Sequence, residues 1–287
     1  MRQRTGEPPL CVYQPPVVDG DLSILAIAYE KLKGRAGKSA GAFELAMALD
    51  ADDVIIRSIV VPSGLTDAQL EQVAIVEAVA NVPVPPEEVC LDFLRVAAPG
   101  PAREERVNLA FCRRERVDHL LAIAESVPVK MRVVDRDVQA IHDAACVCVV
   151  PDSSAGLPHY PFALLLTSLQ PRLVICLDPL HFEVYPIRRA DDPLALPGEG
   201  VRQQIANCWT RCRMAHDLSA TALMAVWQIG ESIEIGECRA LPESDEGAMA
   251  IHPLPMRSLN VLIPEGEVAP PDEVLLVAWG MSMRGLA

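Results

Sequence analysis

The feature that most constrains the fold is a close succession of strand and helix signals across residues 54–140. It opens with a β-branched run over 54–61, which Pro62 ends. Thr66 then stands three residues before Gln69, which is the spacing of a capping box, and the apolar residues after it recur at helical intervals. The sequence therefore predicts a strand over 54–61 and a helix that begins at Thr66.

The rest of this segment can be divided in the same way. The helix must end near Asn81, because Pro83 and the prolines after it cannot continue the intrahelical hydrogen bonds. The periodicity then predicts two strands, a helix and a further strand. These cover residues 89–96, 107–112, 117–124 and 129–134. The segment is thus expected to be an α+β module.

A set of spaced positions in this module resembles one protein family. They are Val61-Pro62, Leu65, Leu70, Glu77, Val82-Pro83, Val89, Leu91-Asp92-Phe93, Leu109-Ala110, residues 113–115, Val133-Val134-Asp135 and Ala140. Their order and spacing are similar to those of PilM, the actin-like cytoplasmic component of type IV pilus inner-membrane complexes. The closing residues 275–287 are similar to the last helix of the same proteins.

The resemblance implies an α/β (α+β) fold of the actin-like, FtsA/PilM-like kind, with two lobes. We expect a first lobe over residues 1–170, shortened at its N-terminus, with a small inserted subdomain at about 53–135. The second lobe is expected over 171–287, opening with a hairpin at 172–187 and followed by a helix at 201–216. Two domains also suit a chain of 287 residues of which 51% are hydrophobic.

Actin-like proteins bind ATP with magnesium between two turns rich in glycine and hydroxyl groups, whose backbone N–H groups hold the phosphates. The nearest fragment to the first turn is Asp19-Gly20-Asp21, which stands beside a predicted helix at 22–33 instead of between strands. We interpret it as the turn that begins that helix. The first phosphate turn is therefore expected to be missing.

The second phosphate turn is expected at Asp178, Pro179, Leu180 and His181. Pro179 lacks an amide donor, and Leu180 stands where the family carries glycine. Gly230 is alone where the family has paired glycines on the adenine side. The sequence therefore predicts a degenerate nucleotide site, no cofactor and no enzyme activity.

One alternative is a working actin-like ATPase with a divergent site. In that case ATP would bind with magnesium, and an acidic residue such as Asp135 or Asp178 would hold the ion. A related alternative is the actin-like domain of a type II secretion platform, which differs mainly in its partner.

The resemblance also implies peptide binding. Proteins of this family capture the N-terminal cytoplasmic peptide of the membrane protein PilN, and a PilN-like partner is therefore expected, with the pilus motor ATPase as a further candidate partner. An extended peptide needs a groove with an exposed strand edge or apolar pockets. We expect that groove near Leu91, Phe93, Phe111 and Arg113. The alternative assigns the two phenylalanines to the core and Arg113 to a solvated surface.

Composition and charge exclude other classes of protein. A net charge of -14 disfavours nonspecific binding to nucleic acid and direct adhesion to anionic lipid. The apolar runs are far shorter than the ~20 residues of a membrane-spanning helix, and no signal peptide is recognisable. We therefore expect a cytoplasmic protein that is peripheral at the inner membrane through its partner, without inserting into it.

Two motifs suggest phosphate or metal binding and are interpreted differently. The stretch at 34–39 ends like a P-loop around Lys38, but Leu32 stands where the first glycine should be, so a linker is favoured. Cys208, Cys212 and His216 recur every four residues on one predicted helix face. The first and last would be ~12 Å apart along a straight helix, so a core stripe is favoured over a zinc site.

The remaining reactive residues are also given structural interpretations. Cys146 and Cys148 are placed on one side of a predicted strand, where thiols pack as small apolar groups. The nine cysteines are expected to be reduced. Residues 152–158 contain Ser153-Ser154 near His142 and His159, but they carry no G-x-S-x-G signature and are expected to form a surface loop.

Overall fold

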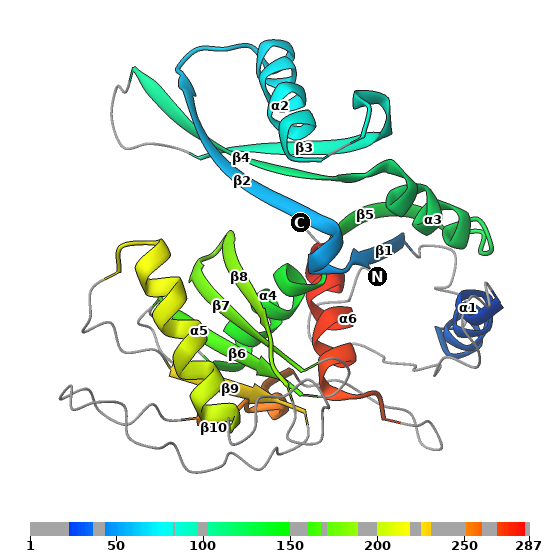
Figure 1. Ribbon diagram of the computed structural model, residues 1–287. Coiled ribbons are helices and arrows are strands. Elements are labelled where there is room, and N and C mark those ends of the chain that lie inside the picture. The colour runs from blue at the N-terminus through cyan, green and yellow to red at the C-terminus, as the bar shows by residue number, and fades with distance from the viewer. Residues whose placement is uncertain are drawn as a thin grey trace. The chain divides into compact units, whose positions relative to one another are not determined.

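The computed structural model describes residues 23–36, 44–82, 84–96, 103–149, 160–167, 171–188, 200–218, 225–230, 251–259 and 269–284. In these ranges the chain forms three sheets and several helices (Figure 1). The contacts separate two compact units, one made mainly of residues 16–137 and the other mainly of 138–283.

The first unit contains a small parallel pair of strands with helices. The helix α1 (Ser23–Ala36) precedes β1 (Glu44–Leu49), which pairs in parallel with β5 (Lys130–Arg136). A short 3-10 turn, η2 (Ala51–Asp53), leads from β1 into the next sheet. The helix α3 (Arg114–Ala124) connects that sheet to β5.

The second sheet of this unit belongs to the segment that the sequence predicts as an α+β module. It has the order β2-β4-β3 and is antiparallel throughout, with β2 (Val54–Pro62), β3 (Val89–Val96) and β4 (Glu104–Arg113). The helix α2 (Asp67–Asn81) packs on one face. Its core consists of Val61, Leu70, Ala74, Ala78, Val82, Val89, Val107, Leu109 and Phe111. The predicted strands and helices of this segment are all confirmed, with small differences at their ends.

The start of α2 shows why the prediction succeeds here. Thr66 has an extended backbone, its Oγ1 accepts from the Gln69 amide at 3.3 Å, and its own amide donates to the Gln69 Oε1 at 2.9 Å. This is the capping box that the sequence predicts, and it satisfies N–H groups that would otherwise lack helical partners.

The second unit is built around a five-stranded sheet of order β10-β9-β6-β7-β8. Its strands are β6 (Phe162–Leu166), β7 (Arg172–Asp178), β8 (His181–Pro186), β9 (Ala225–Ile229) and β10 (Ile251–Pro253). Its helices are α4 (Asp137–Val149), α5 (Val201–Ala215), the 3-10 turn η4 (Met256–Leu259) and α6 (Asp272–Arg284). The predicted hairpin at 172–187, the helix at 201–216 and the closing helix are all present.

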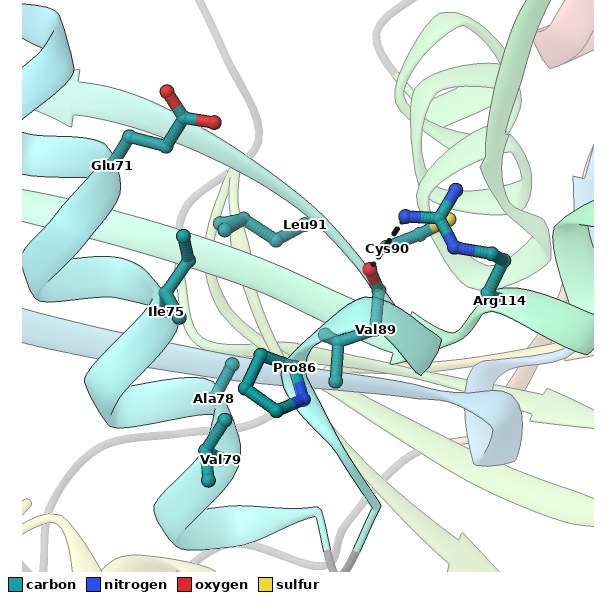
Figure 2. A pocket seen from close by; sticks show the side chains of 9 residues that line it. All are labelled: Glu71, Ile75, Ala78, Val79, Pro86, Val89, Cys90, Leu91 and Arg114. Carbon is teal, nitrogen blue, oxygen red and sulfur yellow. Dashed lines mark hydrogen bonds between the residues drawn. The ribbon is translucent and has the colours of Figure 1, made fainter.

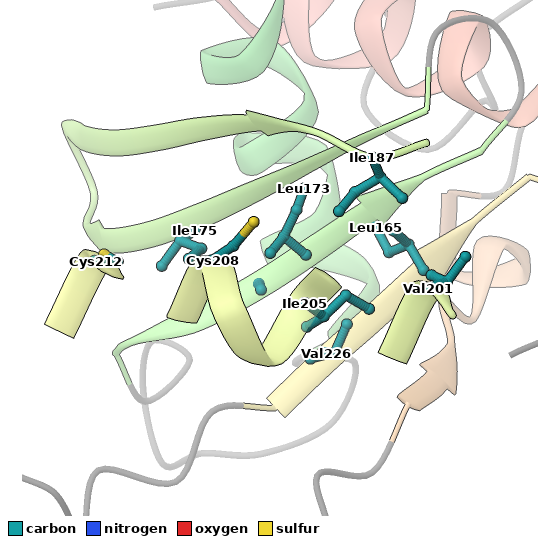
Figure 3. Close-up of a cluster of buried hydrophobic side chains, with 10 residues drawn as sticks. Leu165, Leu173, Ile175, Ile187, Val201, Ile205, Cys208, Cys212 and Val226 are labelled. Atoms are coloured by element: carbon teal, nitrogen blue, oxygen red, sulfur yellow. The ribbon is translucent and has the colours of Figure 1, made fainter. Parts of the chain in front are cut away.

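The helix α5 packs its apolar stripe on one face of this sheet. Figure 3 shows Val201, Ile205, Cys208 and Cys212 pointing from the helix towards strand residues such as Leu173. All of them are buried. The predicted core stripe on α5 is thus confirmed, and both thiols serve as small apolar groups in it.

One predicted element is wrong. Cys146 and Cys148 lie in the helix α4, not on a strand, and Cys148 is buried while Cys146 is only partly so. The buried residues Ile141, Ala144 and Ala145 recur at helical spacing. A short apolar run is ambiguous between strand and buried helix, and packing on a sheet decides in favour of the helix here.

The strand order also bears on the predicted lobes. A boundary after residue 170 would separate β6 from its partners β7 and β9, whereas the compact units divide after Asp137. Likewise β5, at the end of the predicted insert of 53–135, pairs with β1 outside it. The three-stranded sheet and α2 therefore form the compact part of that insert. The assignment of lobes itself stays a prediction.

Among the described helices, none combines the length and the apolar character that crossing a bilayer requires.

Candidate functional site

A hollow of about 310 Å³ lies between the helix α2 and the edge strand β3. We call it the α2–β3 hollow, and Figure 2 shows the side chains that line it. They are Glu71, Ile75, Ala78, Val79, Pro86, Val89, Cys90, Leu91 and Arg114. Seven of these nine lining residues are apolar, and Glu71 and Arg114 add one acidic and one basic side chain. Such a surface suits an apolar side chain of a ligand.

The hollow adjoins the open edge of a sheet. Within the described part of the chain, β4 is the strand that pairs with β3, so the other side of β3 is an edge. The Val89 carbonyl accepts from Arg114 at 3.3 Å, and the Phe93 amide donates to the Asp92 Oδ1 at 2.8 Å. The odd-numbered residues of β3 thus direct their backbone N–H and C=O groups away from β4. The backbone groups of Leu91 therefore also face the open edge.

Arg114 holds the start of β3 in place. Its Nε donates to the Glu87 carbonyl at 2.7 Å, and its Nη2 donates to the Val89 carbonyl. These bonds hold the 3-10 turn η3 (Pro86–Glu88) and the first residue of β3 against α3. Glu71 projects from α2 at the other side of the hollow (Figure 2). The two walls are therefore marked by opposite charges.

The walls of the hollow are also tied together elsewhere. The Arg95 guanidinium on β3 contacts Glu105 on β4, donates to the Leu65 carbonyl at 2.7 Å and pairs with Asp67 at 2.9 Å. The last two partners lie at the start of α2. The helix is thus anchored to the strand that forms the opposite wall, which keeps the hollow preformed.

The structure places the four predicted partner-binding residues in different surroundings. Leu91 lines the hollow, and partly buried Phe93 packs against the core beside it. Phe111 is 1% exposed, which agrees with the alternative that it is a core residue. Arg113 is exposed and lines a second hollow, of about 230 Å³, with Asp53 and other residues.

Sequence reasoning missed Ile75 and Val79, and it interpreted Arg114 as part of a solvated helix start, or as one of several arginines facing an acidic partner, and did not place it at the groove. A signal for the first two was present, because α2 carries a second apolar stripe beside the buried residues Leu70, Ala74 and Ala78. An apolar stripe wider than one core face indicates a second contact. The role of Arg114 depends on backbone carbonyls 25 and 27 residues away and leaves no such signal.

The predicted phosphate turn is the tip of the β7–β8 hairpin. The Leu180 amide donates to the Asp178 Oδ1 at 2.8 Å, and the Pro179 carbonyl accepts from Gln139 Nε2 at 3.1 Å. Asp178 is paired with His181 across the turn. Pro179 has no amide hydrogen to donate. The amide of the next residue, Leu180, is already bonded to the Asp178 carboxylate.

Another antiparallel strand pair of the same sheet precedes this turn. The sequence predicts that 172–187 is the first hairpin of the second lobe, but β6 pairs antiparallel with β7 one step earlier. The first hairpin of this sheet is therefore β6–β7, and the residues between these strands, 168–170, lie outside the described ones.

Gly230 follows directly after β9 and has a φ of 94°, a conformation that glycine adopts without strain. The preceding Ile229 carbonyl accepts from the Thr167 amide at 3.0 Å and from its Oγ1 at 2.8 Å. The bonds join the ends of β9 and β6. The residues that follow Gly230, up to 250, lie outside the described part.

Other predicted candidates fall into three groups. Asp19-Gly20-Asp21, Lys38 and the residues Asp152, Ser153, Ser154 and His159 lie outside the described ranges. Asp135 accepts from the Arg136 amide at 2.8 Å. His142 is buried between aromatic rings, with its Nε2 2.7 Å from the Tyr160 hydroxyl. It therefore belongs to the packed interior.

Residues 17–158, about half of the chain, match the family model of the type IV pilus assembly protein PilM. No curated protein matches the chain. Among solved structures it is similar to a PilM-PilN type IV pilus biogenesis complex, with 18% identity and a TM-score of 0.56. This alignment covers 96% of this chain and 90% of that one.

A second solved structure shares less. It is the cytoplasmic domain of EpsL, an inner membrane component of the type II secretion system of Vibrio cholerae. It has 13% identity and a TM-score of 0.48, over 91% of this chain and 79% of that one. The fold class predicted from the sequence is confirmed by the fit to the pilus protein. This chain is a PilM-like protein with an actin-like fold.

Proposed function

We propose that this chain is a cytoplasmic scaffold of a type IV pilus inner-membrane assembly complex. In this proposal it binds the N-terminal cytoplasmic peptide of a PilN-like membrane protein in the α2–β3 hollow. The observation that carries the proposal is a hollow of about 310 Å³, lined mainly by apolar residues, beside an open strand edge. The match to the PilM family and the similarity to a PilM-PilN complex support this class of partner.

The mode of binding follows from the edge strand. A peptide that extends along β3 would exchange backbone hydrogen bonds with Leu91, while one of its apolar side chains enters the hollow against Ile75 and Val79. Backbone bonds supply affinity and the pocket supplies specificity for the side chain. Glu71 and Arg114 select the charges that flank that side chain, since like charges would be repelled.

Binding of this kind would hold the chain at the inner membrane through its partner. The pilus motor ATPase is a further partner under this proposal, and no residue of this chain is assigned to it. The scaffold role needs only that the peptide reaches the hollow while its own protein stays anchored in the membrane.

We further propose that the scaffold works without a nucleotide. Two observations support this. The Leu180 amide at the predicted phosphate turn is bonded to Asp178. The segment from β6 to the start of β7, residues 162–171, contains no glycine and no acidic residue. A turn that binds phosphate and magnesium would need glycine there, so that the backbone can approach the phosphates, and a carboxylate for the ion.

The test is a calorimetric titration of the purified chain with a peptide from the N-terminus of a PilN-like protein of the same organism. Val79→Asp should weaken binding by about ten-fold or more, because a carboxylate would enter an aliphatic hollow. Val76→Asp is the matched control, since Val76 lies on the same helix, is 71% exposed and does not line the hollow. Equal effects of the two substitutions would contradict the proposed site.

A second titration, with ATP and magnesium, tests the nucleotide part separately. We expect no binding heat, with or without bound peptide. Micromolar binding of ATP would overturn the proposed degenerate site and would favour the alternative, an actin-like ATPase of a pilus or type II secretion platform, while leaving the peptide result to stand by itself.

A further inference from the structure

Three side chains with metal-binding atoms converge at one end of the second unit. His181 and Glu183 belong to β8, and His216 directly follows α5. The His216 Nε2 is 2.9 Å from the Glu183 Oε1, and the His181 Nε2 is 3.8 Å from the same oxygen. One ligand atom from each residue lies within 4.8 Å of the other two.

The backbone explains why these side chains meet. Residues two apart on a strand share a face, so His181 and Glu183 project to the same side of β8. The His216 amide donates to the Cys212 carbonyl at 3.0 Å, which holds His216 as the C-terminal cap of α5. Because Cys212 is buried in the core that joins α5 to the sheet, the position of His216 relative to β8 is fixed by packing.

The distances are close to those of a zinc site. Zinc bonds of about 2.0–2.1 Å in a tetrahedron place neighbouring ligand atoms about 3.4 Å apart. The two contacts of Glu183, 2.9 and 3.8 Å, lie on either side of that value. Small side-chain rotations would therefore suffice for one ion to contact all three.

The exposure of the cluster permits an ion to enter. The side chains of His216, Glu183 and His181 are 25%, 35% and 41% exposed, respectively.

We propose that His181, Glu183 and His216 form a binding site for a divalent transition metal, most suitably zinc. Two imidazoles and one carboxylate are a ligand set that zinc accepts, and the fourth position is then left to water or to an added ligand. An ion at this place would link the β7–β8 hairpin to the end of α5. It would stabilise the folded second unit, because the unfolded chain does not hold these groups together.

The cluster differs from the cysteine-containing site considered from the sequence. Cys208 and Cys212 are buried in the core, and His216 turns to Glu183 on the neighbouring strand. The ligands come from two elements far apart in the sequence, so no spacing motif reveals them. The competing interpretation is a hydrogen-bonded histidine–glutamate cluster that binds no ion.

The experiment uses the full chain after treatment with a chelator, titrated with zinc chloride in competition with a chelating dye. We expect one bound ion per chain. His181→Ala, Glu183→Gln and His216→Ala should each weaken binding by about ten-fold or more, while His119→Ala, an exposed histidine of α3, should not change it. Circular dichroism of each variant confirms that it is folded.

Cobalt serves as a second probe, because its spectrum distinguishes thiolate from nitrogen and oxygen ligands. We expect no thiolate absorption band, and zinc should raise the melting temperature of the native chain but not that of Glu183→Gln. Failure to bind zinc, binding that is unchanged in the Glu183→Gln variant, or a thiolate band that accompanies the bound ion would each overturn the proposal.

Discussion

Gly280 of α6 lies so close to Ala140 of α4 that a side chain at position 280 has no room. A Cβ atom there would stand 2.0 Å from the Ala140 carbonyl oxygen and 2.6 Å from its carbonyl carbon. Neither atom can rotate away, because both belong to the backbone of a helix whose Ala140 is buried. The two helices therefore pack backbone to backbone at this point, which only glycine permits.

Gly280→Ala should consequently destabilise the second unit. Overpacking a backbone contact of this kind would separate α4 from α6, and we expect a loss of about 3 kcal/mol in the free energy of unfolding. Urea denaturation measures it. Gly34→Ala is the control, because a Cβ atom added at position 34 would have nothing within 4 Å of it, and alanine favours a helix. A Gly280→Ala variant as stable as that control would contradict the close approach.

The capping box of α2 gives a second prediction. Thr66→Ala removes the oxygen that accepts from the Gln69 amide and should cost about 1 kcal/mol of stability. Thr66→Ser keeps an equivalent oxygen and should therefore lose little stability. Chemical denaturation compares the two variants, and equal losses would show that the hydroxyl does not act as the cap.

The ion pair between Arg172 of β7 and Glu273 of α6 is a third case. Their closest atoms are 3.0 Å apart, and the side chains are 13% and 4% exposed. Arg172→Met would take this cation away from a buried carboxylate, which costs about 3–5 kcal/mol.

The double variant Arg172→Met with Glu273→Leu removes both charges and should recover most of that loss. A double-mutant cycle of unfolding free energies therefore measures the coupling. If the double variant loses as much as the sum of the two single variants, the pair does not contribute in the way the geometry indicates.

The cysteines of α4 provide a prediction about pH. Burial raises the pKa of the Cys146 and Cys148 thiols from 9.0 to about 11. Folding therefore favours the neutral thiols, so their contribution to stability is complete below about pH 9 and is lost as the pH rises towards about 11.

At about pH 8 the same shift lowers the thiolate fraction of each by about 100-fold relative to the unfolded chain. Labelling with iodoacetamide, followed by mass spectrometry of the α4 peptide, should be slow in the native protein and fast in urea. Native labelling at the unfolded rate would contradict the burial of these thiols.

How much the sequence predicts depends on the range of the interactions involved. The boundaries of α2 follow from Thr66, Gln69 and the prolines after Asn81, which all act within a few residues, and the structure reproduces them. The apolar run around Cys146 and Cys148 predicts a strand, but it forms the helix α4. Its helical conformation is favoured by packing against residues far away in the chain, including Gly280.

The candidate sites show the same division. Leu91 is correctly predicted on its strand, because a strand follows from local periodicity, whereas the edge position of that strand follows only from the pairing of β3 with β4. The hollow beside it also needs Arg114, whose bonds run to the backbone of η3 and β3. The meeting of His181 and Glu183 with His216 depends on how α5 lies on the sheet. Pairings of this kind have no counterpart in the order of residues.

Arg114 and its neighbour Arg113 permit a decisive comparison at the proposed peptide site. Both are exposed arginines at the start of α3, but of the two only Arg114 lines the α2–β3 hollow and bonds the Glu87 and Val89 carbonyls. Arg114→Ala releases the turn before β3, so we expect peptide affinity to fall by about ten-fold, in proportion to the loss of one or two hydrogen bonds to a charged group. Arg113→Ala should leave it within about two-fold. Calorimetry with the PilN-like peptide measures both, and a larger loss for Arg113→Ala would move the binding site to the second hollow, which Arg113 lines with Asp53.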